Sequence, residues 1–167
     1  MSKIDFKDQV VWITGASSGI GEALARRLAA QEKQTLVLVA RRQDKLAALA
    51  AELKTTPGAR VETIVLDLEV PGAAAQLLAD VEARGLAIDT LINNAGFGLN
   101  NLFADMPLDR IQGMMQLNMV ALTELSHGVL PGMRLRRQGR IMNIASVAAF
   151  QACPRFAVYG ATKAYVL

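Results

Sequence analysis

The sequence lacks the features that mark several common classes of protein. It has one cysteine, Cys153, in 167 residues, which excludes an internal disulfide framework and favours a reducing compartment. No apolar run is long enough to span a membrane, and the first six residues lack the apolar core of a signal peptide. The net charge is only +3, too small an excess to indicate nucleic-acid binding. We therefore expect a cytoplasmic protein without a membrane or nucleic-acid partner.

Clusters of metal-ligating residues are also missing. The one histidine, His127, lies in an apolar helical stretch with no second ligand-type cluster beside it. Arginines do gather near one predicted helix end, where the helix dipole favours cations, and a solvated helix end explains them better than a nucleic-acid site: Arg134, Arg136, Arg137 and Arg140. We expect no metal site.

Short apolar runs alternate with amphipathic stretches along the whole chain. The runs predict strands at 10–13, 35–40, 61–66, 88–92 and 141–144, with helices between them. Such alternation requires right-handed crossovers and a doubly wound parallel α/β sheet of Rossmann type, in the order 3-2-1-4-5. Ligands of this fold bind where the strand order reverses, between the first and fourth strands. Residues 1–167 are expected to form one domain.

Three of the predicted helices have informative boundaries. Pro71 is expected to open one of them, and a long helical stretch runs from about Met114 to Arg137. The last helix begins after Pro154 and is still running at Leu167, with no Gly or Asn cap. We therefore expect a piece of a longer protein.

A glycine-rich turn joins the first strand to the first helix. Gly15 allows the tight reversal, Gly19 lets backbone N–H groups approach an anion, and Gly21 gives room for close packing. The positive end of the helix dipole and its unpaired N–H groups suit a pyrophosphate. A surface turn would also use glycine and serine, but the position between strand and helix favours a dinucleotide site.

The ends of the second and third strands carry the next candidates. Ala40 stands where an acid would bind the ribose of NAD, and Arg41 and Arg42 follow it, which favours the 2′-phosphate of NADP. The alternative is an ordinary basic loop. Asp67, followed by Leu68, is placed to accept a hydrogen bond from adenine or, equally, to cap the next turn.

Polar residues continue at the fourth strand and in the long helix. Asn93, Asn94, Ala95 and Gly96 let the backbone approach a cofactor, or mainly hold the sheet and the glycine loop in place. Asn118 is an amide in an apolar helical stretch, so it serves either as a packing device or as part of a polar relay.

The strongest constellation is Ser146, Tyr159 and Lys163. The tyrosine and the lysine are four residues apart and share a helix face. An ammonium beside a phenol favours the phenolate, which produces a general acid and base. A serine hydroxyl can hold a carbonyl oxygen by donating a hydrogen bond.

Taken together, these motifs resemble the short-chain dehydrogenase/reductase family with a Tyr-x-x-x-Lys active site. The resemblance rests on Thr14-Gly-Ala-Ser-Ser-Gly-Ile-Gly21, Asn93-Asn-Ala-Gly96, Asn118, Ser146 and Tyr159-Gly-Ala-Thr-Lys163. It implies that Tyr159 is the acid/base, that Lys163 binds the nicotinamide ribose and that Ser146 orients the substrate carbonyl. It further implies that Asn118 supports a water-linked proton relay and that Arg41 meets the 2′-phosphate.

The resemblance implies an NADP(H)-dependent oxidoreductase, with NAD(H) less favoured, that acts on a small-molecule carbonyl or secondary alcohol. It also implies a homodimer or homotetramer. The alternative is a non-catalytic NADP-binding or assembly module, since the C-terminal part of such domains is absent. The expected cofactor-binding residues are Gly15, Ser17, Ser18, Gly19, Ile20, Gly21, Arg41, Arg42, Asp67, Leu68, Asn94, Ala95, Gly96, Tyr159 and Lys163.

Overall fold

The fold is built on a five-stranded parallel sheet. The computed structural model describes residues 6–31 and 33–167, and its sheet has the order β3-β2-β1-β4-β5. The order predicted from the alternation of elements is confirmed, and every neighbouring pair is parallel. The strands are β1 (Val10–Thr14), β2 (Thr35–Ala40), β3 (Arg60–Val65), β4 (Thr90–Asn93) and β5 (Arg140–Asn143).

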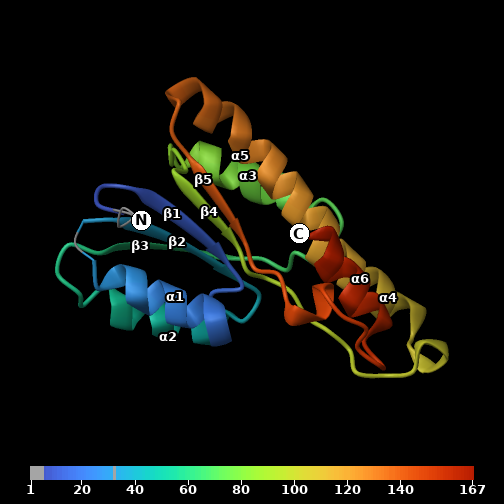
Figure 1. Ribbon diagram of the computed structural model, residues 1–167. Helices are drawn as coiled ribbons and strands as arrows, with labels where there is room; N and C mark the ends of the chain where they lie inside the picture. Colours follow the sequence, from blue (N-terminus) through green and yellow to red (C-terminus); the bar gives the residue numbers. More distant parts are fainter. Residues whose placement is uncertain (1–5, 32) are drawn as a thin grey trace.

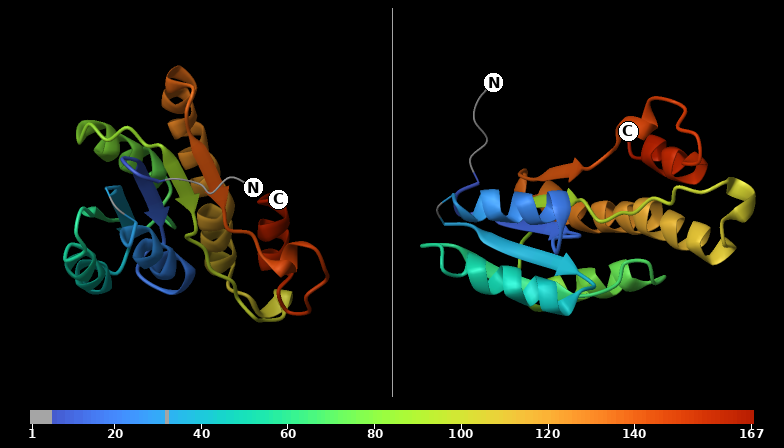
Figure 2. Two further views of the ribbon diagram at one scale, coloured as in Figure 1. Left: turned by 60° about the vertical axis from the view of Figure 1, so that its left-hand side comes forward. Right: turned by 90° about the horizontal axis from the view of Figure 1, so that it is seen from below.

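Helices cover both faces of the sheet, as parallel strands require. Helices α1 (Gly19–Ala29) and α2 (Gln43–Leu53) lie on one face, and α3 (Ala73–Ala83) and α5 (Leu122–Arg136) lie on the other (Figure 1). Helix α4 (Leu108–Met115) leads into α5 through a six-residue π-helix, Gln116–Ala121. Together with α6 (Ala157–Tyr165), α4 extends past the carboxyl ends of the strands (Figure 2).

The core consists of two apolar clusters separated by the sheet. Strand residues alternate between the faces, so Val11 joins the cluster under α1 and α2, whereas Trp12 joins the cluster under α3 and α5. Leu46 of α2 and Leu77 of α3 are fully buried, one in each cluster. Strand β2 supplies residues to both clusters, which explains its uninterrupted apolar sequence.

The predicted bounds of three helices are wrong. The long helical stretch begins at Leu108 rather than Met114, because Gly113 interrupts the apolar signal and lowers helix propensity without ending the helix. Pro71 lies before α3, which begins at Ala73 after Gly72 with a φ of 83°. The last helix ends at Tyr165, before the final two residues.

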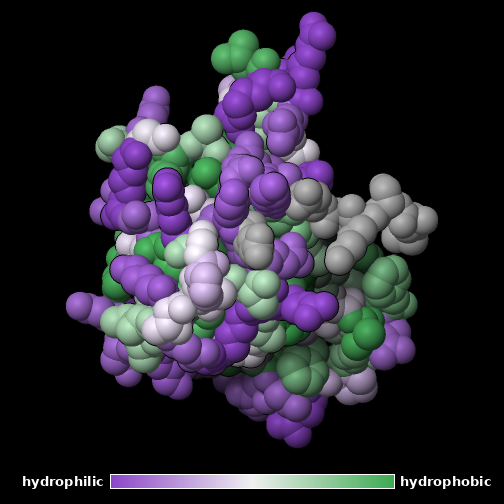
Figure 3. Space-filling model, turned by 90° about the vertical axis from the view of Figure 1, so that its left-hand side faces the viewer, coloured by the Kyte–Doolittle hydropathy of each residue, from purple (hydrophilic) through white to green (hydrophobic). Residues whose placement is uncertain are grey.

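Figure 3 shows the side of the molecule where β1 and β2 begin. Hydrophilic side chains cover much of the centre and left of this side, and hydrophobic atoms gather toward its lower right (Figure 3). None of the helices among the described residues is long and apolar enough to cross a membrane. The functional candidates lie at the opposite end, where the strands finish.

Candidate cofactor site and active site

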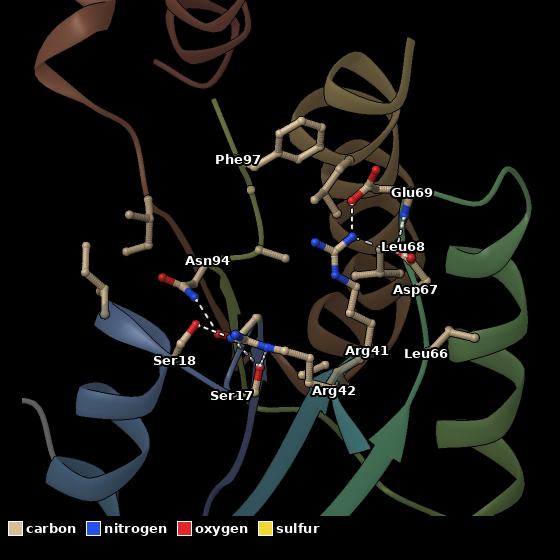
Figure 4. Close-up of a pocket in the computed structure, with 18 of the residues that line it drawn as sticks. Ser17, Ser18, Arg41, Arg42, Leu66, Asp67, Leu68, Glu69, Asn94 and Phe97 are labelled. Atoms are coloured by element: carbon tan, nitrogen blue, oxygen red, sulfur yellow. Dashed lines mark hydrogen bonds and ion pairs between the residues drawn. The ribbon is translucent and has the colours of Figure 1, made fainter. Parts of the chain in front are cut away.

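A pocket of about 450 Å³ lies at the carboxyl ends of the strands (Figure 4). Its walls come from the segments that follow β1, β2, β3, β4 and β5 and from one face of α6. Most of the site residues predicted from the sequence line it. Four predicted residues lie outside its lining: Gly19, Gly21, Asn118 and Ser146.

The glycine loop forms the floor of one end of the pocket. Gly15 has a φ of 67°, and a Cβ atom there would lie 2.8 Å from the Cα atom of Ala95. A Cβ atom on Gly21 would collide with the carbonyl group of Gly15. The glycine loop itself therefore occupies the space that a side chain at position 21 would need. Ser18 precedes α1 without capping it through its side chain. The first N–H groups of α1 therefore stay available to an anion.

Asn94 holds the glycine loop from the neighbouring strand. Its Nδ2 donates to the carbonyl oxygens of Thr14, at 3.0 Å, and Gly15, at 3.2 Å. In return, Thr14 Oγ1 accepts from the backbone N–H groups of Asn94 and Ala95. These contacts agree with the second of the two roles considered for the Asn-Asn-Ala-Gly run, in which Asn94 holds the sheet and the glycine loop together.

The two arginines after β2 have different surroundings. Arg42 donates to Ser17 Oγ at 3.2 Å and to Ser18 Oγ at 2.6 Å, so its guanidinium lies at the glycine loop. Arg41 forms an ion pair with Glu69 and lies 3.7 Å from Asp67 Oδ2. Both arginines line the pocket, and both fit a phosphate of a dinucleotide.

Asp67 adopts the turn-capping role that the sequence left open. Its Oδ1 accepts from the backbone N–H of Glu69 at 3.0 Å. The neighbouring Leu68 is buried and contributes an apolar wall. A polar rim beside an apolar wall suits a flat heterocycle such as adenine.

Tyr159 and Lys163 line the other end of the pocket from α6. The Lys163 ammonium is buried, donates to the Ile144 carbonyl at 2.6 Å and lies 6.0 Å from the centre of the Tyr159 ring. Burial lowers the pKa of Lys163. The loop after β4 passes over the tyrosine ring, since a Cβ atom on Gly98 would lie 2.8 Å from its Cδ2 atom.

Asn118 lies behind the pocket, in the π-helix, and is buried. Its Oδ1 accepts from Phe97 N at 3.1 Å, and its Nδ2 donates to Phe97 O at 2.9 Å and to Thr162 Oγ1 at 3.0 Å. The amide thus joins the π-helix, the loop after β4 and α6. These contacts are those of a residue that holds neighbouring segments together.

Ser146 follows β5 and caps the 3-10 turn Val147–Ala149, where its Oγ accepts from Ala148 N at 3.2 Å. This turn packs against α6, the helix of Tyr159. A hydroxyl that accepts one hydrogen bond keeps its own hydrogen to donate. Ser146 thus retains the donor that a carbonyl oxygen requires.

The structure adds pocket residues that the sequence prediction missed, among them Glu69, Phe97 and Ile144. Glu69 stands two residues after Asp67, in the turn that follows β3. Phe97 directly follows the Asn-Asn-Ala-Gly run, and Ile144 comes two residues before Ser146. Their positions after strand ends were the available signal.

The remaining candidates form no site of their own. His127 is exposed on α5, and Cys153 is partly exposed in the segment before α6. Among residues 6–31 and 33–167, no group of three or more His, Cys, Asp and Glu side chains could hold a metal ion.

Comparison with known proteins agrees with this geometry. The family model described as short chain dehydrogenase matches residues 9–167. The chain belongs to the short-chain dehydrogenase family. A short-chain dehydrogenase from Sphingobium yanoikuyae, solved in complex with NADPH, is 40% identical with a TM-score of 0.88 over 95% of this chain.

Two further proteins similar to the present chain are also informative. The ketoacyl reductase HetN of Nostoc is 38% identical over 93% of this chain. The NADP-dependent 3-hydroxy acid dehydrogenase YdfG of Salmonella typhi is 36% identical over 94% of it. The chain spans 54% of the length of HetN, 62% of YdfG and 61% of the Sphingobium protein.

Proposed function

We propose that this protein is an NADP(H)-dependent oxidoreductase that exchanges hydride with a small-molecule carbonyl or secondary alcohol. The observation that carries the proposal is one pocket with two complementary ends. The glycine loop, Arg42 and the uncapped start of α1 form an anion site at one end, and Tyr159 and Lys163 lie at the other. The NADPH bound to the Sphingobium relative and the NADP dependence of YdfG support this choice of cofactor.

The proposed binding roles follow the pocket from one end to the other. The first N–H groups of α1 receive the pyrophosphate, and the arginines receive the 2′-phosphate. Asp67 and Leu68 border the adenine, and the run from Asn94 to Gly96 lies along the path to α6. The bound nicotinamide supplies or accepts the hydride.

The proposed chemistry of the chain's own residues is proton transfer and orientation. The Tyr159 hydroxyl gives its proton to the carbonyl oxygen during reduction and takes it back during oxidation. Ser146 donates a hydrogen bond to the same oxygen. The Lys163 ammonium, held by the Ile144 carbonyl, stabilises the phenolate that remains. Asn118 takes the relay role only through water, because its amide is already engaged by Phe97 and Thr162.

A second candidate is a non-catalytic NADP-binding or assembly module. It predicts cofactor binding without turnover. The main proposal includes a cytoplasmic location, favoured by the single cysteine, and a homodimer or homotetramer, which rests on the family resemblance.

The first test is a parallel titration with NADPH and NADH, read by nicotinamide fluorescence. Trp12 is fully buried and does not line the pocket, so its emission is a poor reporter of binding. We expect tighter binding of NADPH. Absence of binding of both cofactors would contradict the proposal.

The second test is Tyr159→Phe in a carbonyl-reduction assay with NADPH. We expect turnover to fall by a factor of about 100 or more, because the acid is removed, while NADPH affinity stays within a few-fold. A variant that keeps half its rate would refute the acid/base role. Binding with no turnover by the unaltered chain would favour the second candidate.

A further inference from the structure

Glu69 occupies the wall of the pocket between two arginines. Its side chain is 13% exposed, against 55% for Arg41 and 42% for Arg110. One carboxylate oxygen pairs with Arg41 (Figure 4), and the other lies 3.2 Å from Nη1 of Arg110. The carboxylate therefore has a fixed place, although both of its partners reach solvent.

Two arginines, Arg41 and Arg42, and two carboxylates, Asp67 and Glu69, line this end of the pocket. Both of these carboxylates lie near Arg41, and none of the described residues forms an ion pair with Arg42, which instead donates to two serine hydroxyls. Of the two arginines, Arg42 is thus the one ready for an anion.

A phosphate group carries a charge of about −1.5 to −2 at neutral pH. To reach Arg41, it must replace the carboxylate of Glu69 as the partner of that guanidinium, and it must approach a second negative charge. NADH lacks the 2′-phosphate and meets neither obstacle. Glu69 therefore opposes the binding of NADPH and does not affect the binding of NADH.

We infer that Glu69 is a specificity-determining residue that restrains the preference for NADP(H) by holding Arg41 as an internal ion pair. The inference rests on the proposed cofactor and deepens it. Glu69 weakens NADPH binding through charge, so its removal strengthens NADPH binding selectively.

Arg110 modulates the same carboxylate from the opposite side. It extends from α4, pairs with the second oxygen of Glu69 and stacks over the Phe97 ring at 4.7 Å. While Arg110 is in place, it shares the negative charge that Glu69 presents to Arg41. Neutralising Arg110 leaves that charge to Arg41 and strengthens the internal pair.

The test measures dissociation constants for NADPH and NADH with four variants. In Glu69→Gln, we expect NADPH to bind about three to five times more tightly, the size of a partly solvated ion pair, with NADH within twofold. In Arg110→Gln, we expect weaker NADPH binding by a similar factor, and Arg110→Lys should restore most of it. Glu62→Gln removes a glutamate that pairs with Arg84 on the surface and should change neither constant.

The outcomes separate this inference from the proposed function. If the unaltered chain binds no NADPH, the proposed function fails. If it binds NADPH but Glu69→Gln leaves the ratio of the two constants unchanged, or weakens NADPH binding, the inference alone is overturned. Should Glu69→Gln fail to fold, the Arg110→Gln variant still tests the inference, because we expect it to bind NADPH more weakly. Unchanged or tighter NADPH binding by Arg110→Gln would contradict the inference.

Discussion

Lys163 is the buried cation of the site, and its ammonium has the Ile144 carbonyl as a partner. Because burial disfavours the charged form, its pKa in the folded state lies below the ordinary value. At pH values between the pKa of Lys163 in the folded chain and its ordinary pKa in the unfolded chain, the unfolded chain binds more protons than the folded one. Stability therefore rises with pH through this window, and below it the burial of the ammonium opposes folding in full.

The pH dependence of Lys163→Met tests this argument. The methionine variant lacks the titration, so we expect its free energy of unfolding relative to the unaltered chain to fall as pH rises from 7 to 10. Urea unfolding followed by circular dichroism at several pH values measures the difference. Lys45→Met, which alters an exposed lysine of α2, is the matched control and should show a smaller trend. A flat difference for Lys163→Met would refute the argument.

At the scale of elements, the π-helix gives Asn118 its reach. A π-helix departs from the spacing of an α-helix and commonly occurs at functional sites. Here, it places one amide against both the Phe97 backbone and Thr162 of α6. The helix that carries Tyr159 is thus attached to the long helix by a polar contact as well as by packing.

Asn118→Ala should loosen α6 selectively. The Phe97 backbone groups and the Thr162 hydroxyl lose their partner, and such unsatisfied groups cost about 1–3 kcal/mol. We expect amide hydrogen exchange in residues 157–165 to rise about tenfold, with little change in α1. Thr162→Ser keeps the hydroxyl and is the control. An equal rise in α1 would mean that the variant destabilises the whole fold.

Sequence patterns predicted the elements better than their ends and connections. The apolar runs of β1 and β2 identified the strands because such runs are local signals. The start of α4 was missed because Gly113 interrupts the local signal, whereas the π-helix and the pair of Arg41 with Glu69 involve contacts between segments far apart in the chain. In the site, the glycine loop and the Tyr159–Lys163 pair were predictable from spacing, whereas the side-chain partners of Asp67 and Asn118 required the fold.

At the scale of the molecule, the sheet divides the core into two parts. Leu46 and Leu77 are both fully buried but belong to different clusters. Substitutions that share no partners are expected to act independently on stability. The clusters on the two faces of the sheet should therefore make independent contributions to the free energy of unfolding, although both unfold in a single transition.

The variants Leu46→Ala and Leu77→Ala test this separation. Each should lower the free energy of unfolding by about 2–5 kcal/mol, the usual effect of removing a buried leucine. The double variant should lose the sum within about 0.5 kcal/mol. Urea titrations followed by circular dichroism give all three values. A loss in the double variant well below or above the sum would show that the two clusters are coupled.

The bond between Asn94 and the glycine loop has a consequence for the order in which the protein is made. The partners stand 80 residues apart in the sequence, so a growing chain exposes the whole loop long before the amide that holds it. Domains generally fold as units during synthesis. A nascent chain that ends before β4 therefore carries every glycine of the loop but lacks the amide that holds it, and we expect NADPH added during synthesis to engage only chains that extend past Asn94.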